Sequence, residues 1–179
     1  VRIGRYANED DSENFVREEE IVIHPYDTWS MDHTLALIIV PMLKQLKETK
    51  HGAPNIETAD VPLFLKPTQL EISRYRENGT TDKNFFKRWD YVMEEMIWAF
   101  EQIADEDSEE QFYSGNHDVK WVPCDEEGNE VSKEDATYHR MDRGPKDTFK
   151  IDQEGLKKHY DRIDNGLRLF GKYYRSLWD

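Results

Sequence analysis

The chain has 179 residues and a single cysteine, Cys124, so no disulfide can form within it, and we expect a reducing compartment. Its 38 acidic and 24 basic residues give a net charge of −14, which repels nucleic-acid backbones and disfavours general nucleic-acid binding. Aromatic residues make up 12% of the sequence, which argues against disorder. No apolar stretch is long enough for a bilayer and no signal peptide is recognisable, so we expect one domain, residues 1–179, with no membrane contact.

The N-terminal part predicts a small β element followed by a helix. Residues 1–26 suggest two short strands around an acidic loop, and the β-branched segment Glu20–His24 ends at Pro25. Residues 30–51 predict the first helix, in which Pro41 should produce a kink. The apolar residues expected on its buried face are Leu35, Ile38, Ile39, Met42 and Leu46.

The rest of the chain alternates long connections with two more helices. Residues 53–81 predict an irregular connection, either a lid or a segment that wraps the bundle. Residues 83–104 and 153–178 predict amphipathic helices, and two short strands, 120–122 and 148–151, are expected to pair between them. The predicted fold class is therefore mainly α, a three-helix-based bundle with a small N-terminal β element and long irregular connections.

Several sequence blocks resemble a family of tailed-bacteriophage proteins. They are His24–Ala36 (HPYDTWSMDHTLA), Pro41–Lys47, Lys50-His51-Gly52, Phe86–Gln102 and Arg162–Tyr174 (RIDNGLRLFGKYY). The resemblance covers most of residues 20–179. It implies a phage protein that acts in the cytoplasm of the infected bacterial host or in the virion, and it implies no particular activity.

The first helix carries a stripe of basic residues that could bind an anion. At 100° per residue, His33, Lys44 and His51 fall on one side of the helix, with Lys47 close by. Trp29 precedes the helix N-terminus, where free N–H groups favour an anion, and its indole could stack on a ring. The alternative is that the stripe is a solvated edge and Trp29 packs against the protein.

The third helix and Arg88 supply further candidate ligand-binding residues. Asn165, Arg168 and Lys172 lie away from the expected core face. The Arg168 guanidinium could bind a phosphate or carboxylate through two parallel hydrogen bonds. Two interior glycines, Gly166 and Gly171, suggest close approach of a ligand or another helix. Alternatively, these cations pair with the acidic second helix.

A metal site is the weaker alternative. Glu94, Glu101 and Asp105 align on one face of the second helix beside Trp98, which itself points away from the expected core and should contact the third helix, another subunit or a ligand. Acidic residues on a helix most often form its solvated face. The sequence shows no phosphate-binding loop, no zinc-ligating cysteine pair and no carboxylate di-iron motif, so no cofactor is predicted.

Three functions are consistent with these patterns. The favoured one is a phage-encoded, non-catalytic binding protein for a small anionic or nucleotide-like ligand, which could sequester a nucleotide-type host defence signal. The second is a virion structural or assembly component, and the third is a metal-dependent nucleotide hydrolase. We also expect a homo-oligomer, because exposed aromatic residues leave apolar surface for another subunit to cover.

Overall fold

The computed structural model describes residues 6–7, 16–17 and 20–178 of the chain. Although the sequence predicts one domain, the contacts divide the chain into two compact units. Unit 1 runs to residue 106 and resumes at residue 161, and unit 2 comprises residues 107–160. The division arises because the strands of residues 113–151 pair with one another.

The mainly α fold class is confirmed. The four α-helices of the described residues are α1 (Met31–Thr49), α2 (Gln69–Asn78), α3 (Phe85–Ala104) and α4 (Gln153–Tyr173). Short 3₁₀ turns lie at Pro25–Thr28, Thr58–Asp60, Leu63–Leu65, Glu110–Phe112 and Tyr174–Ser176. The three predicted helices therefore exist with nearly the predicted bounds, and α1 continues as a helix through Pro41. Within the described residues, no helix is both long and apolar enough to cross a membrane.

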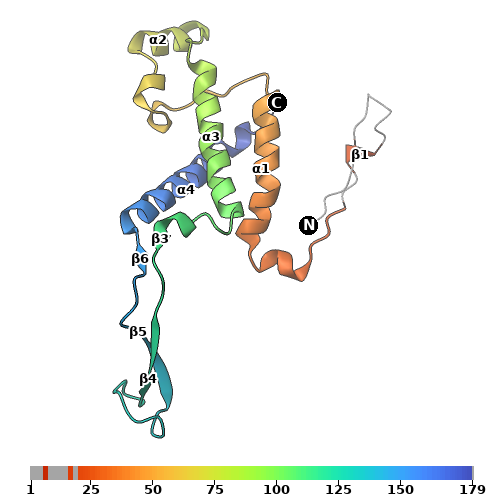
Figure 1. Ribbon diagram of the computed structural model, residues 1–179. Coiled ribbons are helices and arrows are strands. Elements are labelled where there is room, and N and C mark those ends of the chain that lie inside the picture. The colour runs from red at the N-terminus through yellow and green to blue at the C-terminus, as the bar shows by residue number, and fades with distance from the viewer. Residues whose placement is uncertain (1–5, 8–15, 18–19, 179) are drawn as a thin grey trace. The chain divides into compact units, whose positions relative to one another are not determined.

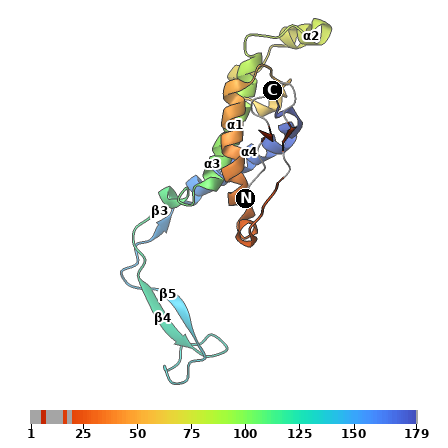
Figure 2. The ribbon, with the colours of Figure 1, turned by 90° about the vertical axis from the view of Figure 1, so that its right-hand side faces the viewer.

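The core of unit 1 forms where α1 and α3 lie side by side (Figures 1 and 2). The buried face of α3 agrees with the sequence pattern, since Trp89, Val92, Met96 and Phe100 are all buried. The buried residues of α1 are instead Ala36 and Leu43. The predicted face of α1 is therefore wrong in part, because Leu35 and Met42 are 43% and 63% exposed.

The segment between α1 and α3 wraps the core, which was one of the two alternatives for it. Ile56, Val61 and Leu65 from this segment are buried in the core cluster. It also contains the helix α2, which the sequence analysis missed. A capping box between Thr68 and Glu71 begins α2, and Gly79, with φ of 71°, ends it.

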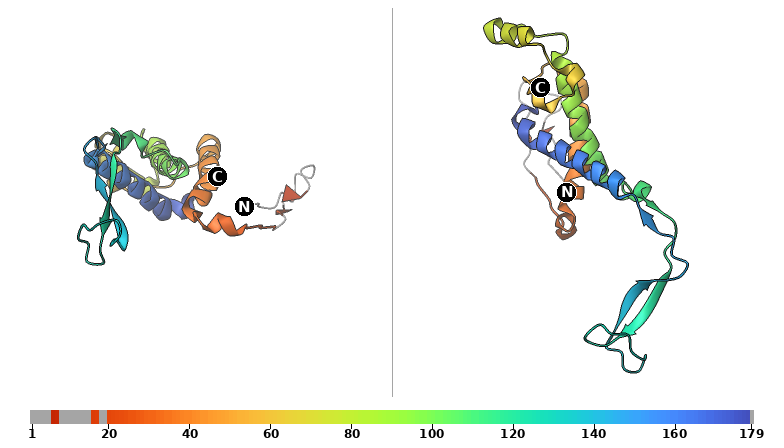
Figure 3. Two further views of the ribbon diagram at one scale, coloured as in Figure 1. Left: turned by 60° about the horizontal axis from the view of Figure 1, so that its bottom comes forward. Right: turned by 90° about the vertical axis from the view of Figure 1, so that its left-hand side faces the viewer.

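In unit 1, α4 runs across α3 rather than alongside it (Figure 3). Gly166 makes this crossing possible, because a Cβ there would lie 2.3 Å from the Ala99 Cβ and 2.7 Å from the Glu95 carbonyl oxygen. Leu169 and Tyr173 are buried at the crossing, whereas Tyr174, which helical spacing also places on the apolar face of residues 153–178, is 63% exposed. A single close crossing therefore buries a narrower strip of α4 than the sequence pattern predicts.

The β structure of the described residues consists of three two-stranded antiparallel sheets. In unit 2, β4 (Val119–Cys124) pairs with β5 (Tyr138–Arg143), and β3 (Tyr113–Ser114) pairs with β6 (Lys150–Ile151). The predicted pairing of residues 120–122 with 148–151 is therefore wrong, because the nearer strand β5 closes a hairpin with β4. Near the N-terminus, β1 (Tyr6–Ala7) pairs with β2 (Val16–Arg17). Most of the predicted acidic loop lies outside the described residues, and Glu20–His24 holds one isolated bridge position rather than a strand.

Candidate functional site

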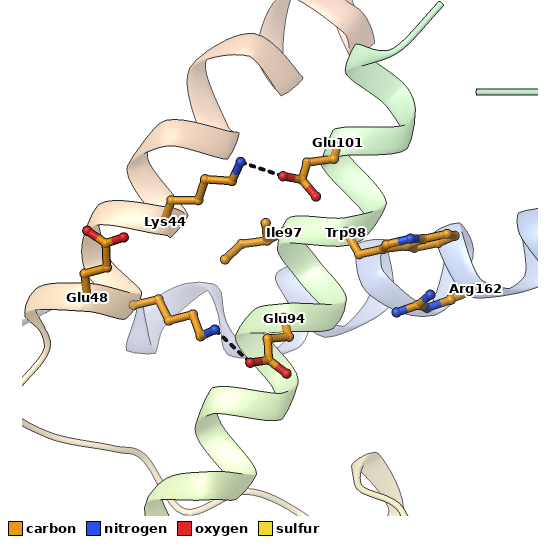
Figure 4. Close-up of a pocket in the computed structure, with 8 residues that line it drawn as sticks. Lys44, Glu48, Glu94, Ile97, Trp98, Glu101 and Arg162 are labelled. Carbon is orange, nitrogen blue, oxygen red and sulfur yellow. Dashed lines mark hydrogen bonds and ion pairs between the residues drawn. The ribbon is translucent and has the colours of Figure 1, made fainter. Parts of the chain in front are cut away.

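Three ion pairs, one after another along the two helices, connect α1 and α3. Lys44 Nζ lies 2.6 Å from Glu101 Oε1, Lys47 Nζ lies 2.7 Å from Glu94 Oε1, and Lys50 Nζ lies 2.6 Å from Asp90 Oδ1. Because the partner numbers fall as the lysine numbers rise, the two helices are antiparallel. Figure 4 shows the lysines of α1 reaching across to Glu101 and Glu94. The lysines are thus used to join two helices.

Beside these pairs, an open groove of about 550 Å³ contains an indole and a guanidinium, and we call it the Trp98 groove. Its lining residues are Lys44, Lys47, Glu48, Glu94, Ile97, Trp98, Glu101 and Arg162. The Arg162 guanidinium lies over the Trp98 ring, 3.9 Å from its centre (Figure 4). Of the three alternatives given for Trp98, a contact with the third helix, another subunit or a ligand, the structure shows the contact with the third helix.

A buried carboxylate fixes that guanidinium. Arg162 donates two hydrogen bonds to Glu95, of 3.0 Å to Oε2 and 2.8 Å to Oε1, and the Glu95 side chain is only 11% exposed. The hydrogen bonds to Glu95 raise the pKa of Arg162 above its usual range. Counting Glu95, the three cations around this groove face four carboxylates, so it is not a selective site for an anion.

The predicted basic stripe of α1 does not form one site. His33 lies at the other end of the α1–α3 pair, where its Nε2 is 3.1 Å from the carbonyl oxygen of Ala104. His51 lies beyond the end of α1 and is exposed. Alignment by angle was misleading because α1 rises about 24 Å between His33 and its last residue, Thr49, which is already too far for one small ligand.

Arg88 is part of the interior and not of a surface site. It is 3% exposed, and its guanidinium donates to Asp82 Oδ1 at 3.0 Å, Asp82 Oδ2 at 2.5 Å and the Leu65 carbonyl at 3.0 Å. These bonds join the start of α3 to the segment between α1 and α3 that wraps the core, which we call the wrapping segment. The role predicted for Arg88 in ligand binding is therefore replaced by a structural one.

The cations of α4 converge on Asp60, whose side chain is 3% exposed. Asp60 accepts from Lys172 Nζ at 2.6 Å and from the Tyr173 hydroxyl at 2.7 Å, and its Oδ1 lies 2.8 Å from Arg168. Burial alone would raise the pKa of Asp60, but the hydrogen bonds from Lys172, Tyr173 and Arg168 outweigh it and lower the pKa below its usual value. Burial and the bond to Asp60 raise the pKa of Tyr173 to about 12.

The remaining residues of the predicted α4 site belong to the same network. Asn165 Oδ1 accepts from Arg168 at 2.9 Å, and Lys172 also pairs with Glu57 at 2.7 Å. These cations do pair with acids, as the alternative stated. The acids lie in the segment between α1 and α3 that wraps the core, and not on the second helix as expected. The sequence analysis missed Asp60, for which the only signal is an acid between apolar residues of a segment predicted to be irregular.

The structure does not form the alternative metal site. Glu94 and Glu101 each pair with a lysine, and residues 20–178 contain no group of three His, Cys, Asp or Glu side chains able to hold a metal ion. Helical spacing aligned these acids, but the neighbouring helix supplies Glu94 and Glu101 each with a lysine.

The most unusual surface is a run of apolar side chains before α1, residues 21–31, which we call the N-terminal arm. Its exposed fractions are 68% for Ile21, 60% for Ile23, 75% for Tyr26, 86% for Trp29 and 56% for Met31. A 3₁₀ turn orders its centre, since the His24 N–H donates to Asp27 Oδ2 at 2.7 Å and the Thr28 hydroxyl donates to the Pro25 carbonyl at 3.0 Å. The turn therefore presents two aromatic side chains to solvent on a defined backbone.

No family model matches this sequence, and comparisons with curated proteins and with solved structures found no match.

Proposed function

We propose that this protein is a non-catalytic assembly protein whose copies associate through the N-terminal arm. The observation that carries the proposal is the exposure of Tyr26 and Trp29 on an ordered turn. Tyr and Trp are the residue types most enriched among those that dominate binding energy at protein interfaces. Exposed apolar side chains that gather in one patch mark a contact with another molecule.

The partner that fits the arm best is the arm of a second copy. Between residues 21 and 31 the only acidic side chain is Asp27, and the segment contains no lysine or arginine, although the whole chain has a net charge of −14. A nearly neutral arm lets two strongly acidic copies approach where their mutual repulsion is weakest, and salt screens the rest beyond about 8 Å. A symmetric contact of arm against arm needs no other complementary surface.

Three observations favour assembly over the binding of a nucleotide-like anion. The candidate cations Lys44, Arg88 and Lys172 are all engaged with carboxylates. Around the Trp98 groove, four carboxylates face three cations. The third observation is the arm itself, which contains no lysine or arginine to bind an anion. The resemblance to tailed-phage proteins supports placing this assembly in the phage particle or in its construction.

The test is the subunit count of the purified protein, measured by native mass spectrometry and analytical ultracentrifugation. We expect an oligomer for the wild type and a shift to monomer for the double variant Tyr26→Ser/Trp29→Ser. Trp178→Ser is the matched control, because Trp178 is 74% exposed but lies at the other end of the chain, and it should leave the subunit count unchanged.

A wild-type monomer, or an oligomer unaffected by the arm variant, would overturn the proposal. A retained small molecule of nucleotide mass in the same spectra would favour the ligand-binding function instead. Detection of the protein in purified phage particles would support the virion role.

A further inference from the structure

Two other parts of unit 1 lie against the start of α3. The Asn84 side chain, directly before α3, donates to the Phe64 carbonyl at 3.5 Å. The ring of Tyr75, on α2, lies 5.4 Å from the ring of Phe85, the first residue of α3. The 3₁₀ turn that contains Phe64 and the helix α2 are therefore neighbours of the first turn of α3 (Figure 1).

The cations on these three parts have no acidic partner. All are exposed, and none forms an ion pair within the part of the chain that the structure describes: Lys66, Arg74, Arg76, Lys83 and Lys87. The cations that join α1, α3 and α4 differ, because each of them pairs with a carboxylate: Lys44, Lys47, Lys50, Arg162 and Lys172. Unpaired positive charge is thus concentrated at residues 66–87 of this unit.

The acids of the same region do not neutralise these cations. The Glu71 carboxylate accepts from the Thr68 N–H at 2.7 Å and from the Thr68 hydroxyl at 2.8 Å, and Asp82 pairs with Arg88 in the interior. Residues 63–87 contain more basic than acidic side chains, although the whole chain has a net charge of −14. The region is therefore a local positive surface on an acidic protein.

Large apolar side chains are exposed among the same cations. The exposed fractions are 83% for Leu63, 76% for Phe64, 60% for Leu70 and 51% for Phe86. We call these apolar side chains together with the unpaired cations the α2–α3 surface: Leu63, Phe64, Lys66, Leu70, Arg74, Arg76, Lys83, Phe86 and Lys87. A partner that matches this surface carries both carboxylates and apolar side chains.

The placement of the cations fits a protein segment better than a membrane. Arg74 and Arg76 lie two positions apart, so they point about 200° apart around α2 and cannot both face a flat bilayer. Leu70 is the only large apolar residue of α2 that is exposed, so this helix of 10 residues lacks the apolar face with which a helix lies in a lipid interface. An extended peptide, in contrast, can pass around the helix and reach both arginines.

The charge of the whole chain disfavours a nucleic acid at the same surface. Duplex DNA carries one negative charge about every 1.7 Å, which a chain with a net charge of −14 repels at long range. A peptide with a few carboxylates carries far less charge, and arginine binds a carboxylate through two parallel hydrogen bonds.

We infer that the α2–α3 surface binds an acidic segment of another protein, in which carboxylates alternate with large apolar side chains. The carboxylates pair with the unpaired lysines and arginines, and the apolar side chains cover Phe64 and Phe86. This contact uses no residue of the N-terminal arm, so it does not depend on the proposed self-association.

The first test measures the binding of a synthetic peptide to the full chain by fluorescence anisotropy. The labelled peptide alternates aspartate and glutamate with leucine and phenylalanine. We expect saturable binding, which is lost when asparagine and glutamine replace the acids of the peptide. Binding should weaken with added salt, because the Debye length falls from about 10 Å at 0.1 M to about 3 Å at 1 M.

Charge reversal locates the contact on the protein. Lys83→Glu/Lys87→Glu should weaken the affinity about tenfold, as expected for two reversed surface charges. The variant should fold, because acidic residues are favourable near the N-terminus of a helix. Lys133→Glu/Lys146→Glu is the matched control, since both of these lysines are exposed, lack an ion pair within the described residues and belong to unit 2.

A second variant tests the apolar half of the contact. Phe64→Ser should weaken the affinity for the peptide about fivefold or more, the range of a residue that contributes to an interface. Trp121→Ser is its control, because Trp121 is an aromatic residue of unit 2 that is 62% exposed. Circular dichroism checks that each variant is folded.

Each outcome supports or overturns the inference. No saturable binding of the acidic peptide, or equal effects of the two lysine pairs, would overturn it. Binding to phosphatidylserine vesicles or to a single-stranded oligonucleotide, without binding of the peptide, would assign the surface to a membrane or a nucleic acid instead. A lower subunit count for Lys83→Glu/Lys87→Glu would show that a second copy occupies the surface and would also overturn the inference. The arm variant decides the proposed function separately, so either can fail alone.

Discussion

Asp60 illustrates how a single buried carboxylate organises the charged residues of unit 1. Three side chains of α4 donate to it or pair with it, so residues predicted to bind a ligand instead hold α4 against the wrapping segment. Hydrogen bonds to charged groups contribute more than neutral ones. The network therefore stabilises the fold, and protonation of Asp60 in acid should lower the free energy of unfolding.

We expect Asp60→Asn to destabilise the protein by about 2–3 kcal/mol at neutral pH, because charged hydrogen bonds are lost. The folded-state pKa of Asp60 lies below the unfolded value of about 3.9. Its contribution is therefore complete above that value and is lost as the pH falls through the folded-state pKa. Urea unfolding at several pH values should show wild type and variant converging below about pH 4.

Glu57→Gln provides the control, because Glu57 is 67% exposed and pairs with Lys172 alone. It should change the free energy of unfolding by less than about 1 kcal/mol. A difference between wild type and Asp60→Asn that does not shrink in acid would refute the assigned role of Asp60.

A second prediction at the scale of one residue concerns the contribution of buried Arg88 to stability. Removing one partner of a buried ion pair leaves the other charge uncompensated, so Arg88→Ala should cost about 3–5 kcal/mol. Arg140→Ala is the comparison, because Arg140 makes a similar fork to Asp142, at 2.9 and 3.1 Å, with both side chains more than a third exposed. Chemical denaturation should show a loss below about 1 kcal/mol for Arg140→Ala; equal losses would contradict the structural role of Arg88.

Among the elements, α4 offers a paired test of its crossing with α3. Gly166→Ala forces a methyl group into the Ala99 side chain and the Glu95 carbonyl and should cost about 1–3 kcal/mol. Gly171→Ala meets nothing within 4 Å and should stabilise the helix by about 0.5–1 kcal/mol. Thermal unfolding of both variants measures these opposite signs, and a stabilised Gly166→Ala would mean that the helices do not meet there.

The elements also show what the sequence could and could not predict. Long periodic helices were predictable, because the apolar spacing of Trp89, Val92, Met96 and Phe100 matches one buried face. The face of α1 was predicted less well, because its apolar residues surround more of the helix than one neighbour can bury. The helix α2 was missed because its sequence is short and polar, and its signals are the local cap at Thr68 and the terminal Gly79.

The candidate site was less predictable than the fold for a physical reason. Spacing along a helix gives the side on which His33, Lys44 or Arg168 lies, but not which acid comes to meet it. Partners such as Asp60 and Glu95 come from segments distant in sequence. Trp29 was expected either to stack on a ring or to pack against the protein, and its exposure of 86% shows that it does not pack against the described residues.

For the whole molecule, the proposed association through the arm predicts a link between self-association and stability. Mass action stabilises a folded oligomer more as its concentration rises, so the melting temperature of the wild type should increase with protein concentration. Tyr26→Ser/Trp29→Ser removes side chains that are 75% and 86% exposed, so its intrinsic stability should change little while the slope with concentration falls. Differential scanning fluorimetry across a dilution series measures both quantities. A concentration-independent melting temperature for the wild type would argue against association through the arm, and an equal slope for the variant would assign the association to another surface.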